Sequence, residues 1–279
     1  MYEVNYISGH SLKLKSVDVV AENEQAAVEK AFKMEGHNFE NRLVSVKHKM
    51  QDNSMGMEYV RSKVAELLAN DASGHGMDHI DRVLKLALKF AEKENADKNT
   101  VALIALLHDV DDHKLVGEES AKKLVNARRI LTECDIDDAT RNAVLDALSD
   151  IGYSKRLEGH VPKTIEGQVV SDADMCDAIG ANGILRAHAY GLKTGHPFFD
   201  KNIFPNEDVT SETYTKTCGQ TSVCHIFEKL LKLKDMMLTD SGKIEATKRH
   251  RTMTGFLYSL FEEEEALEWA YYLIEKGID

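Results

Sequence analysis

A histidine-aspartate doublet, His108-Asp109, ends a run of apolar residues that extends from Val101 to Leu107. A run that is apolar on every side is typical of a buried helix or strand. A polar pair is costly in such a place unless something pairs with it, and a metal ion is the commonest partner. His79 and Asp174 lie on other segments with amphipathic spacing, so the chain offers four candidate metal ligands.

His79 is the first outlying candidate. Helical spacing aligns it with Val83, Leu86 and Phe90, which places it near the core-facing edge of its segment. Taken alone, a histidine there is more often structural than a ligand. His75, four residues earlier, lies between glycines, where a capping or loop role is favoured.

The aspartates around 174 are separated by helical spacing. Ser171, Asp174 and Asp177 share one stripe, whereas Asp172 is turned well away from Asp174. We therefore predict that Asp174 is a metal ligand, that Asp177 lies behind the ligands or faces the substrate, and that Asp172 is a helix-surface or capping residue. The alternative is three solvated acids on a surface helix.

Two neutral imidazoles and two carboxylates suit an octahedral divalent ion, with water completing the coordination. Mn, Co, Ni, Fe and Mg all remain candidates. Such an ion lowers the pKa of bound water and polarises a phosphoryl oxygen. No cysteine ligands accompany the set, which disfavours a structural zinc site. Only His113 and His160 lie between Asp109 and Asp174, so one ion is favoured over two.

Other polar residues are weaker candidates. The catalytic candidates are Asp112 and Asp177, because a general acid or base is needed near the ion. The alternative for the segment after the doublet is a solvated loop. His225, Lys229 and Lys232 share a stripe that suits polyphosphate but also suits a solvated helix face. The candidate substrate-binding residues are Arg82, Lys114, Lys155, His225, Lys229 and Lys232.

Composition limits the partners. Lys and Arg number 35 against 47 Asp and Glu, a net charge of −12, which argues against non-specific binding to nucleic acid or anionic membranes. A small phosphorylated substrate remains compatible, because a bound cation reverses the local field. Four scattered cysteines without a CxxC pair, no signal peptide and no long apolar run predict a cytoplasmic protein.

The chain is expected to contain two domains. Residues 1–49 read as a small α+β module, with strands at Tyr2–Ile7, Leu12–Val20 and Arg42–Lys47, and a helix at Asn23–Glu35 that ends near Gly36. Residues 50–56 form the linker candidate. Residues 57–279 read as all-α. The helices expected there cover 59–69, a segment around 80–90, a segment ending at 108, 118–133, 137–149, 164–179, 212–237 and 240–276, with a loop-rich stretch at 191–210.

Three motifs together resemble the HD-superfamily phosphohydrolases. They are G-H-x-x-x-H-I-x-R-V at Gly74–Val83, L-L-H-D-V-D-D-H-K at Leu106–Lys114 and V-x-D-A-D-x-x-D-A-I-G-A at Val170–Ala181. The resemblance covers about residues 57–262 and is greatest to small bacterial HD-domain nucleotide (pyro)phosphohydrolases. It implies an all-α helical bundle with His79, His108, Asp109 and Asp174 as metal ligands. Met175 departs from the family, which usually has a basic residue there.

The resemblance implies hydrolysis of phosphoester or phosphoanhydride bonds in a nucleotide, with (d)NTP to NMP plus pyrophosphate as the leading reaction. A nucleoside monophosphate phosphatase and a phosphodiesterase are alternatives. A nucleotide-sensing binding protein with the same fold is the non-enzyme rival. Residues 1–49 have no counterpart in compact family members, which suggests an interaction module or a homo-oligomer contact. No Walker A loop, GxGxxG or GxSxG motif supports other enzyme classes.

Overall fold

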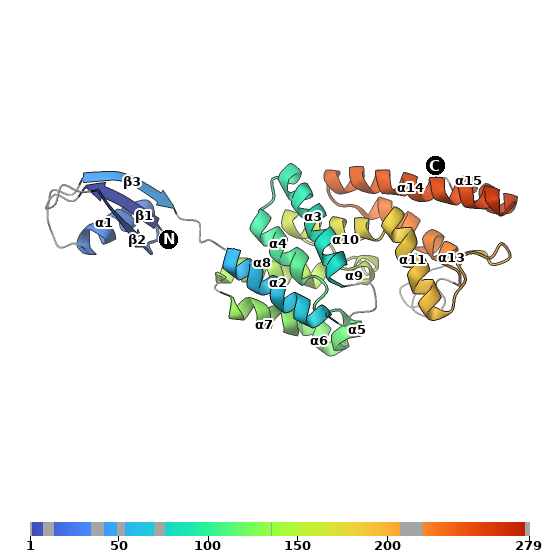
Figure 1. The fold of residues 1–279 in the computed structure, drawn as a ribbon, viewed down its shortest axis with the longest axis horizontal. Helices are drawn as coiled ribbons and strands as arrows, with labels where there is room; N and C mark the ends of the chain where they lie inside the picture. The colour runs from blue at the N-terminus through green and yellow to red at the C-terminus, as the bar shows by residue number, and fades with distance from the viewer. Residues whose placement is uncertain are drawn as a thin grey trace. The chain divides into compact units, whose positions relative to one another are not determined.

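A computed structural model of the chain describes residues 2–7, 14–34, 42–48, 54–69, 76–134, 136–206 and 220–276. The chain divides into two compact units, Met1–Glu58 and Tyr59–Asp279 (Figure 1). The first contains a small sheet with one helix, and the second is built from helices. The predicted fold class, mainly α with a small N-terminal α+β module, is confirmed.

The smaller unit is a three-stranded antiparallel sheet of order β2-β1-β3, with α1 inserted between β2 and β3 along the chain. On the central strand, Val4 lies opposite Val17 on one side and Val46 on the other. The predicted turn at Ser8–His10 and the helix end at Gly36 lie outside the described residues. The elements are β1 (Tyr2–Ile7), β2 (Leu14–Val19), α1 (Glu24–Met34) and β3 (Arg42–His48).

This unit has a hydrophobic core of its own. The alternation of a strand places Val4 and Tyr6 on the same face of β1, where they pack with Ala27 and Ala31 of α1. The Tyr6 and Phe32 rings meet edge to face with centroids 5.3 Å apart. The small unit therefore buries its apolar face internally.

The larger unit is a bundle of helices. Its described helices are α2 (Ser54–Leu68, whose first residues belong to the smaller unit), α3 (Met77–Glu94), α4 (Lys98–Leu107), α5 (His113–Val116), α6 (Glu118–Lys123), α7 (Val125–Glu133), α8 (Asp138–Asp150), α9 (Tyr153–Leu157), α10 (Ile165–Asp177), α11 (Ala181–Thr194), α13 (Ser222–Glu228), the 3₁₀ helix η1 (Leu230–Met236), α14 (Asp240–Glu263) and α15 (Leu267–Glu275).

Three helices, α3, α4 and α10, pack on one another at the centre of the bundle (Figure 1). Every residue from Val101 to Leu107 is buried, as expected of a run that is apolar all round. The α8 helix packs on α4 and α10, and α14 packs on α10 and α3. This arrangement brings together the ends of α4 and α10 and the start of α3, which carry the candidate ligands.

Three helices that the spacing predicts as continuous are each interrupted. The one expected over 118–133 breaks at Leu124, which has a left-handed φ of 51°, and the one over 240–276 breaks near Glu265, with φ of 52°. Within the described part of 212–237, α13 ends at Glu228 and a 3₁₀ helix follows. Periodicity shows which face of a helix is apolar, but it does not report a single residue that leaves helical geometry.

Two predicted boundaries also move. The α11 helix continues to Thr194, so the first part of the predicted loop at 191–210 is helical. The last residues of the predicted linker, 54–56, belong to α2. In contrast, Thr164 caps α10 as predicted, because its side chain accepts a hydrogen bond from the Gly167 amide.

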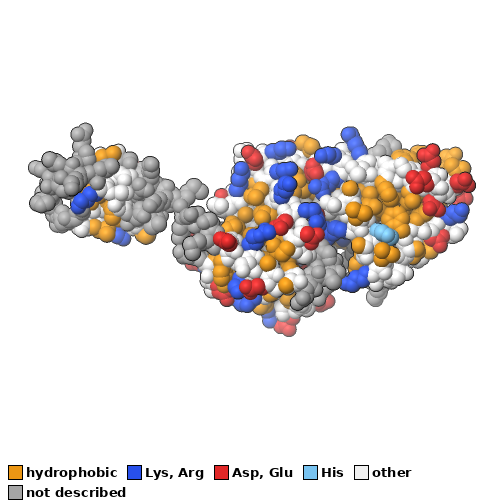
Figure 2. Space-filling model, in the orientation of Figure 1, with side chains coloured by type: hydrophobic (Ala, Val, Ile, Leu, Met, Phe, Trp, Pro, Cys, Tyr) orange, Lys and Arg blue, Asp and Glu red, His pale blue; other side chains and the backbone are white. Residues whose placement is uncertain are grey.

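Hydrophobic side chains are distributed unevenly over the surface of the larger unit (Figure 2). On the face drawn, hydrophobic side chains gather over the region of α11. The exposed apolar residues of α11 include Leu185 and Leu192, at 66% and 65% exposure. Among the described residues, no helix is both long enough and apolar enough to cross a membrane.

Candidate metal centre

The first histidine comes from the start of α3. The helix begins at Met77, after Gly76, and His79 lies in its first turn. Apolar neighbours on the same face, among them Ile80 and Val83, are buried, and His79 itself is 1% exposed. The amphipathic spacing of α3 therefore carries an imidazole into the interior.

The doublet lies where α4 ends. His108 is the residue after Leu107, and the amide of Val110 bonds back to the Leu107 carbonyl in a tight turn. The apolar run anchors α4 in the core, so the turn that follows presents both His108 and Asp109 to the buried start of α3.

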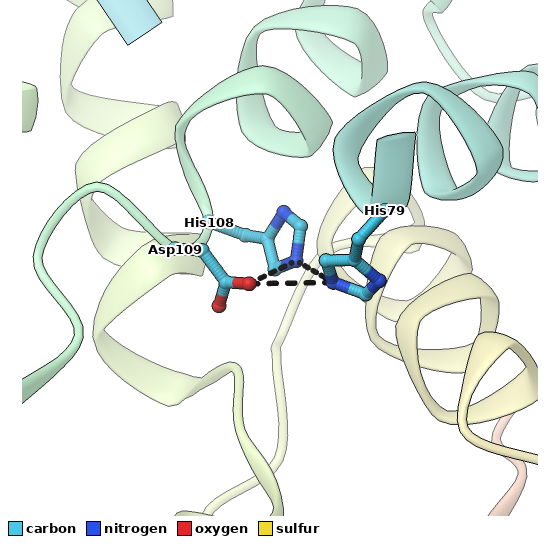
Figure 3. A group of neighbouring side chains, drawn as sticks. All are labelled: His79, His108 and Asp109. Carbon is cyan, nitrogen blue, oxygen red and sulfur yellow. Dashed lines mark hydrogen bonds and ion pairs between the residues drawn. The ribbon is translucent and has the colours of Figure 1, made fainter. Parts of the chain in front are cut away.

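Four side chains converge at this point. The Nε2 atoms of His79 and His108 are 3.1 Å apart. Asp109 Oδ2 lies 3.3 Å from the first and 3.4 Å from the second, and Asp174 Oδ1 lies 3.5 and 3.8 Å from them. Figure 3 shows His79, His108 and Asp109 pointing toward one another. The structure thus brings together all four residues that the sequence singles out as metal ligands.

These separations fit the donor shell of a single ion. Ligand atoms about 2.1 Å from a metal lie about 3.0 Å apart when adjacent in an octahedron and about 3.4 Å apart in a tetrahedron. The separations that involve a histidine nitrogen, 3.1 to 3.8 Å, lie close to both values. The ligand atoms of His79, His108 and Asp109 all lie within 4.8 Å of one another, and Asp174 approaches this group through the two imidazoles. Two nitrogen and two carboxylate donors also have the chemistry that divalent ions of this class prefer.

The opposite side of each ring is held by an acceptor. His79 donates from Nδ1 to Asp177 Oδ2 at 2.7 Å, and His108 donates from Nδ1 to the Ala105 carbonyl oxygen at 2.8 Å. Because neither partner can donate, the proton of a neutral ring stays on Nδ1 and the Nε2 lone pair faces the centre. This is the tautomer that a metal ligand needs.

The electrostatic field of the centre favours positive charge. Burial lowers the pKa of His108, but the Asp109 and Asp174 carboxylates outweigh burial and raise that pKa to about 10. The pKa of His79 is also raised, because hydrogen bonds to Asp109 and Asp177 outweigh its burial. A divalent cation satisfies the same negative potential.

Asp177 lies behind His79. It is 2% exposed and accepts hydrogen bonds from His79, from Arg82 Nε and Nη2, and from Arg186 Nη1. Burial raises its pKa, but the bonds from His79 and Arg82 more than offset this and hold the carboxyl ionised. Of the two predicted positions for Asp177, the geometry favours the one behind the ligands over one that faces the substrate.

Arg82, predicted to contact substrate, is engaged with protein carboxylates. Its guanidinium bonds Asp177 and, through Nη1, Asp78 at 2.9 Å. The hydrogen bonds to Asp177 raise its pKa, so it remains cationic. This geometry favours support of the metal centre over phosphate binding.

The other predicted residues near the doublet differ in environment. Asp112 follows Asp109 in the same turn, and its side chain lies 3.8 Å from His113 Nδ1. The side chain of Lys114 lies outside the described residues. Lys155 donates to the Leu148 carbonyl at 3.0 Å, and burial lowers its pKa.

The predicted stripe of His225, Lys229 and Lys232 does not form. The α13 helix ends at Glu228, and Lys229 leaves helical geometry with φ of −129°. The Lys229 ammonium lies 4.3 Å from the centroid of the Tyr153 ring. Burial and the charge of Lys229 lower the pKa of His225 to about 4, so His225 is neutral near pH 7.

Two acidic residues have structural roles that spacing did not reveal. Asp172, predicted on a helix surface or as a cap, is fully buried and accepts bonds from the amides of Leu238 and Thr239. The surface alternative is therefore wrong, and the residue ties α10 to the start of α14. Asp111 is also buried, not solvated, and its carboxylate accepts bonds from two amides at the start of α7.

Arg186 was not among the predicted site residues. It lies on α11, and its Nη1 is 2.8 Å from Asp177 Oδ2 and 3.4 Å from His79 Nδ1. It lies on an amphipathic helix, and the sequence around it does not indicate an ion pair. Only the approach of α11 to the end of α10 reveals its partner.

Comparison with known proteins places this centre in a family. Residues 76–179 match the HD domain model. YpgQ of Bacillus subtilis, an uncharacterised protein, is 32% identical over 222 residues, which cover 73% of this chain and 91% of YpgQ. A crystal structure of YpgQ in complex with ADP superposes with a TM-score of 0.59 at 31% identity, covering 76% of this chain and 96% of that chain.

Two further crystal structures are similar over most of their length. A Lactobacillus plantarum protein has a TM-score of 0.65 at 34% identity, covering 76% of this chain and 98% of its own. An HD-superfamily hydrolase of Bacillus thuringiensis has a TM-score of 0.61 at 34% identity, covering 77% and 99%. The histidine-aspartate doublet lies within the matched region, and these similarities show that the chain belongs to the HD superfamily.

Proposed function

We propose that the protein is a metal-dependent phosphohydrolase that cleaves a phosphoester or phosphoanhydride bond of a nucleotide, with (d)NTP to NMP plus pyrophosphate as the leading reaction. The observation that carries the proposal is the convergence of His79, His108, Asp109 and Asp174, with both ring Nδ1 atoms tied to acceptors. A site built only for packing has no need of four donors with their lone pairs turned to one point.

When bound, a divalent cation lowers the pKa of water and polarises a phosphoryl oxygen. The four proposed ligands differ in access to solvent. The side chains of His79 and His108 are 1% exposed, whereas those of Asp109 and Asp174 are 12% and 27% exposed. Substrate therefore reaches the centre from the carboxylate side, and the imidazoles form its closed wall.

Asp112 is the proposed general acid or base. Its side chain is 21% exposed and it follows Asp109 in the same turn. A partly exposed carboxyl group so near in sequence to a proposed metal ligand is a candidate to exchange a proton with water or with a leaving phosphate. The nucleotide character of the substrate is supported by the ADP complex of YpgQ, whose chain is matched over 96% of its length.

A nucleotide panel tests the proposal. The chelator-treated chain is supplied in turn with Mn²⁺, Co²⁺, Ni²⁺ or Mg²⁺ and assayed on nucleoside triphosphates, monophosphates and cyclic dinucleotides, with products resolved by ion exchange. We expect pyrophosphate release that Asp109→Asn reduces by more than the roughly 10–100-fold lost when groups behind metal ligands are changed. Asp146→Asn, an exposed aspartate on α8, is the matched control and should retain activity.

The products decide among related activities. Release of inorganic phosphate from monophosphates would indicate a phosphatase, and opening of cyclic dinucleotides would indicate a phosphodiesterase. If no phosphorylated compound is turned over and tight nucleotide binding survives Asp109→Asn, the protein is a nucleotide sensor and the proposal is wrong.

A further inference from the structure

The Asp177 carboxylate is clamped from two directions. Its Oδ1 accepts from Arg82 Nε at 2.7 Å, while its Oδ2 accepts from His79 Nδ1 at 2.7 Å, from Arg186 Nη1 at 2.8 Å and from Arg82 Nη2 at 3.0 Å. Asp177 is 2% exposed, so water has little access to its carboxylate. Every oxygen of Asp177 is therefore oriented by a cationic fork, and Oδ2 is shared between His79 and both arginines.

The two arginines reach Asp177 from different parts of the bundle. Arg82 lies on α3, three residues after His79, so the same helix carries both. Arg186 lies on α11, which packs on α13 and α14. The 3.4 Å separation between Arg186 Nη1 and His79 Nδ1 follows from their common acceptor, because both donors point at Oδ2.

The position of Oδ2 determines how His79 faces the metal centre. A hydrogen bond from Nδ1 to a fixed acceptor sets the plane of the ring and hence the direction of the Nε2 lone pair. Arg82 binds both oxygens of this carboxylate from α3, and the hydrogen bond from Arg186 Nη1 on α11 restrains Oδ2 from a second direction. Displacements below 1 Å are enough to weaken a metal or catalytic site.

We infer that Arg186 is a positioning residue of the metal centre: by holding Asp177 Oδ2, it sets the orientation of His79 and so the affinity of the site for a divalent ion. This inference rests on the ligand set of the proposed function but not on any substrate. It assigns to α11 a direct influence on a centre whose donors come from α3, the turn after α4, and α10.

Metal binding without substrate tests the inference. Mn²⁺ is titrated into the full-length, chelator-treated chain, with the free ion measured by electron paramagnetic resonance. We expect Arg186→Ala to weaken binding by about 10–100-fold, and Arg186→Lys, which keeps the charge and can still donate a hydrogen bond, to weaken it less. Arg251→Ala, an exposed arginine on α14, is the control and should bind like the wild type.

A double-mutant cycle shows whether Arg186 acts through Asp177. In an Asp177→Asn background, Arg186→Ala should cause little further loss, because the acceptor it orients is already changed. The visible spectrum of the Co²⁺-loaded chain gives a second readout, which should shift in Arg186→Ala as the His79 ring turns and should stay unchanged in Arg251→Ala. Circular dichroism establishes that each variant is folded.

Retention of wild-type Mn²⁺ affinity and an unshifted Co²⁺ spectrum in folded Arg186→Ala would overturn the inference. So would losses from the two substitutions that simply multiply in the double variant. A wild-type chain that binds Mn²⁺ with this coupling but cleaves no nucleotide would refute the proposed function and leave the inference standing. A wild-type chain without saturable metal binding would refute both.

Discussion

The two imidazoles of the centre are oriented by partners at very different sequence distances. His108 Nδ1 bonds the carbonyl of Ala105, three residues earlier in the same helix. His79 Nδ1 bonds Asp177, 98 residues away. The orientation of His108 is thus a local consequence of how α4 ends, whereas that of His79 depends on the packing of α3 against α10. Disturbance of tertiary packing should therefore affect His79 first.

The affinity of the centre for metal should depend on pH. The pKa of His108 is raised to about 10 by Asp109 and Asp174 despite burial, and that of His79 is raised as well. When either ring is protonated, the added proton lies on Nε2, and this proton must leave before an ion binds. Apparent affinity should therefore increase with pH, by about tenfold per pH unit for each proton displaced.

Mn²⁺ titrations between pH 6 and pH 8 measure this dependence. Calorimetry in two buffers of different ionisation enthalpy counts the protons released. A flat affinity profile with no proton release would contradict the raised pKa values of both histidines.

At the scale of elements, α10 presents two acidic faces with different partners. Asp174 faces the candidate metal centre and Asp177 lies behind His79, while Asp172 accepts from Leu238 N, Thr239 N and Thr239 Oγ1 at the start of α14. Thr239 Oγ1 in turn accepts from the Gly242 amide, which caps α14. The first turn of α14 is therefore fastened to the helix that carries the proposed metal ligand Asp174.

Two glycines of α14 should respond oppositely to alanine. A Cβ at Gly242 would overlap the Asp172 carboxylate, so α14 or the Asp172 side chain must shift, and we expect Gly242→Ala to destabilise the protein by about 1–3 kcal/mol. A Cβ at Gly255 meets nothing within 4 Å, and Gly255→Ala should stabilise the helix by about 0.5–1 kcal/mol.

Chemical denaturation of both variants measures the difference. Equal stabilities would show that the approach of Asp172 to Gly242 is not tight. A fall in stability of Gly255→Ala would show that its site is more crowded than the structure indicates.

At the scale of the whole molecule, the two units have separate cores. The small sheet buries Val4 and Tyr6 against α1, and all four proposed ligands lie within Tyr59–Asp279. We propose that residues 1–49 are a module for interaction or self-association and not part of the metal centre. YpgQ and the two similar crystal structures match about three quarters of this chain and nearly the whole of their own length.

Removal of residues 1–49 should leave the metal centre intact. We expect Mn²⁺ affinity and nucleotide turnover within about twofold of the full chain, since no proposed ligand or partner is lost. Light scattering of both chains reports whether the module changes the oligomeric state. Loss of metal affinity in a folded truncated chain would show that the small unit supports the centre.

The sequence alone determined the fold class and the metal-ligand candidates. Apolar periodicity in α3, the uninterrupted apolar run of α4 and the Thr164 cap of α10 are local signals, so the positions of these helices could be predicted. The doublet and the motifs around it pointed to the family that the comparisons confirm.

Only the tertiary structure decided which acid serves which partner. Asp172 and Asp177 are both aspartates on α10, yet Asp172 accepts hydrogen bonds from the start of α14 and Asp177 accepts one from His79. Arg186 bonds Asp177 because α11 approaches the end of α10. Likewise, the predicted stripe of His225, Lys229 and Lys232 does not form, because α13 ends at Glu228. Such outcomes depend on which distant segments meet, and helical spacing carries no information about a partner on another element.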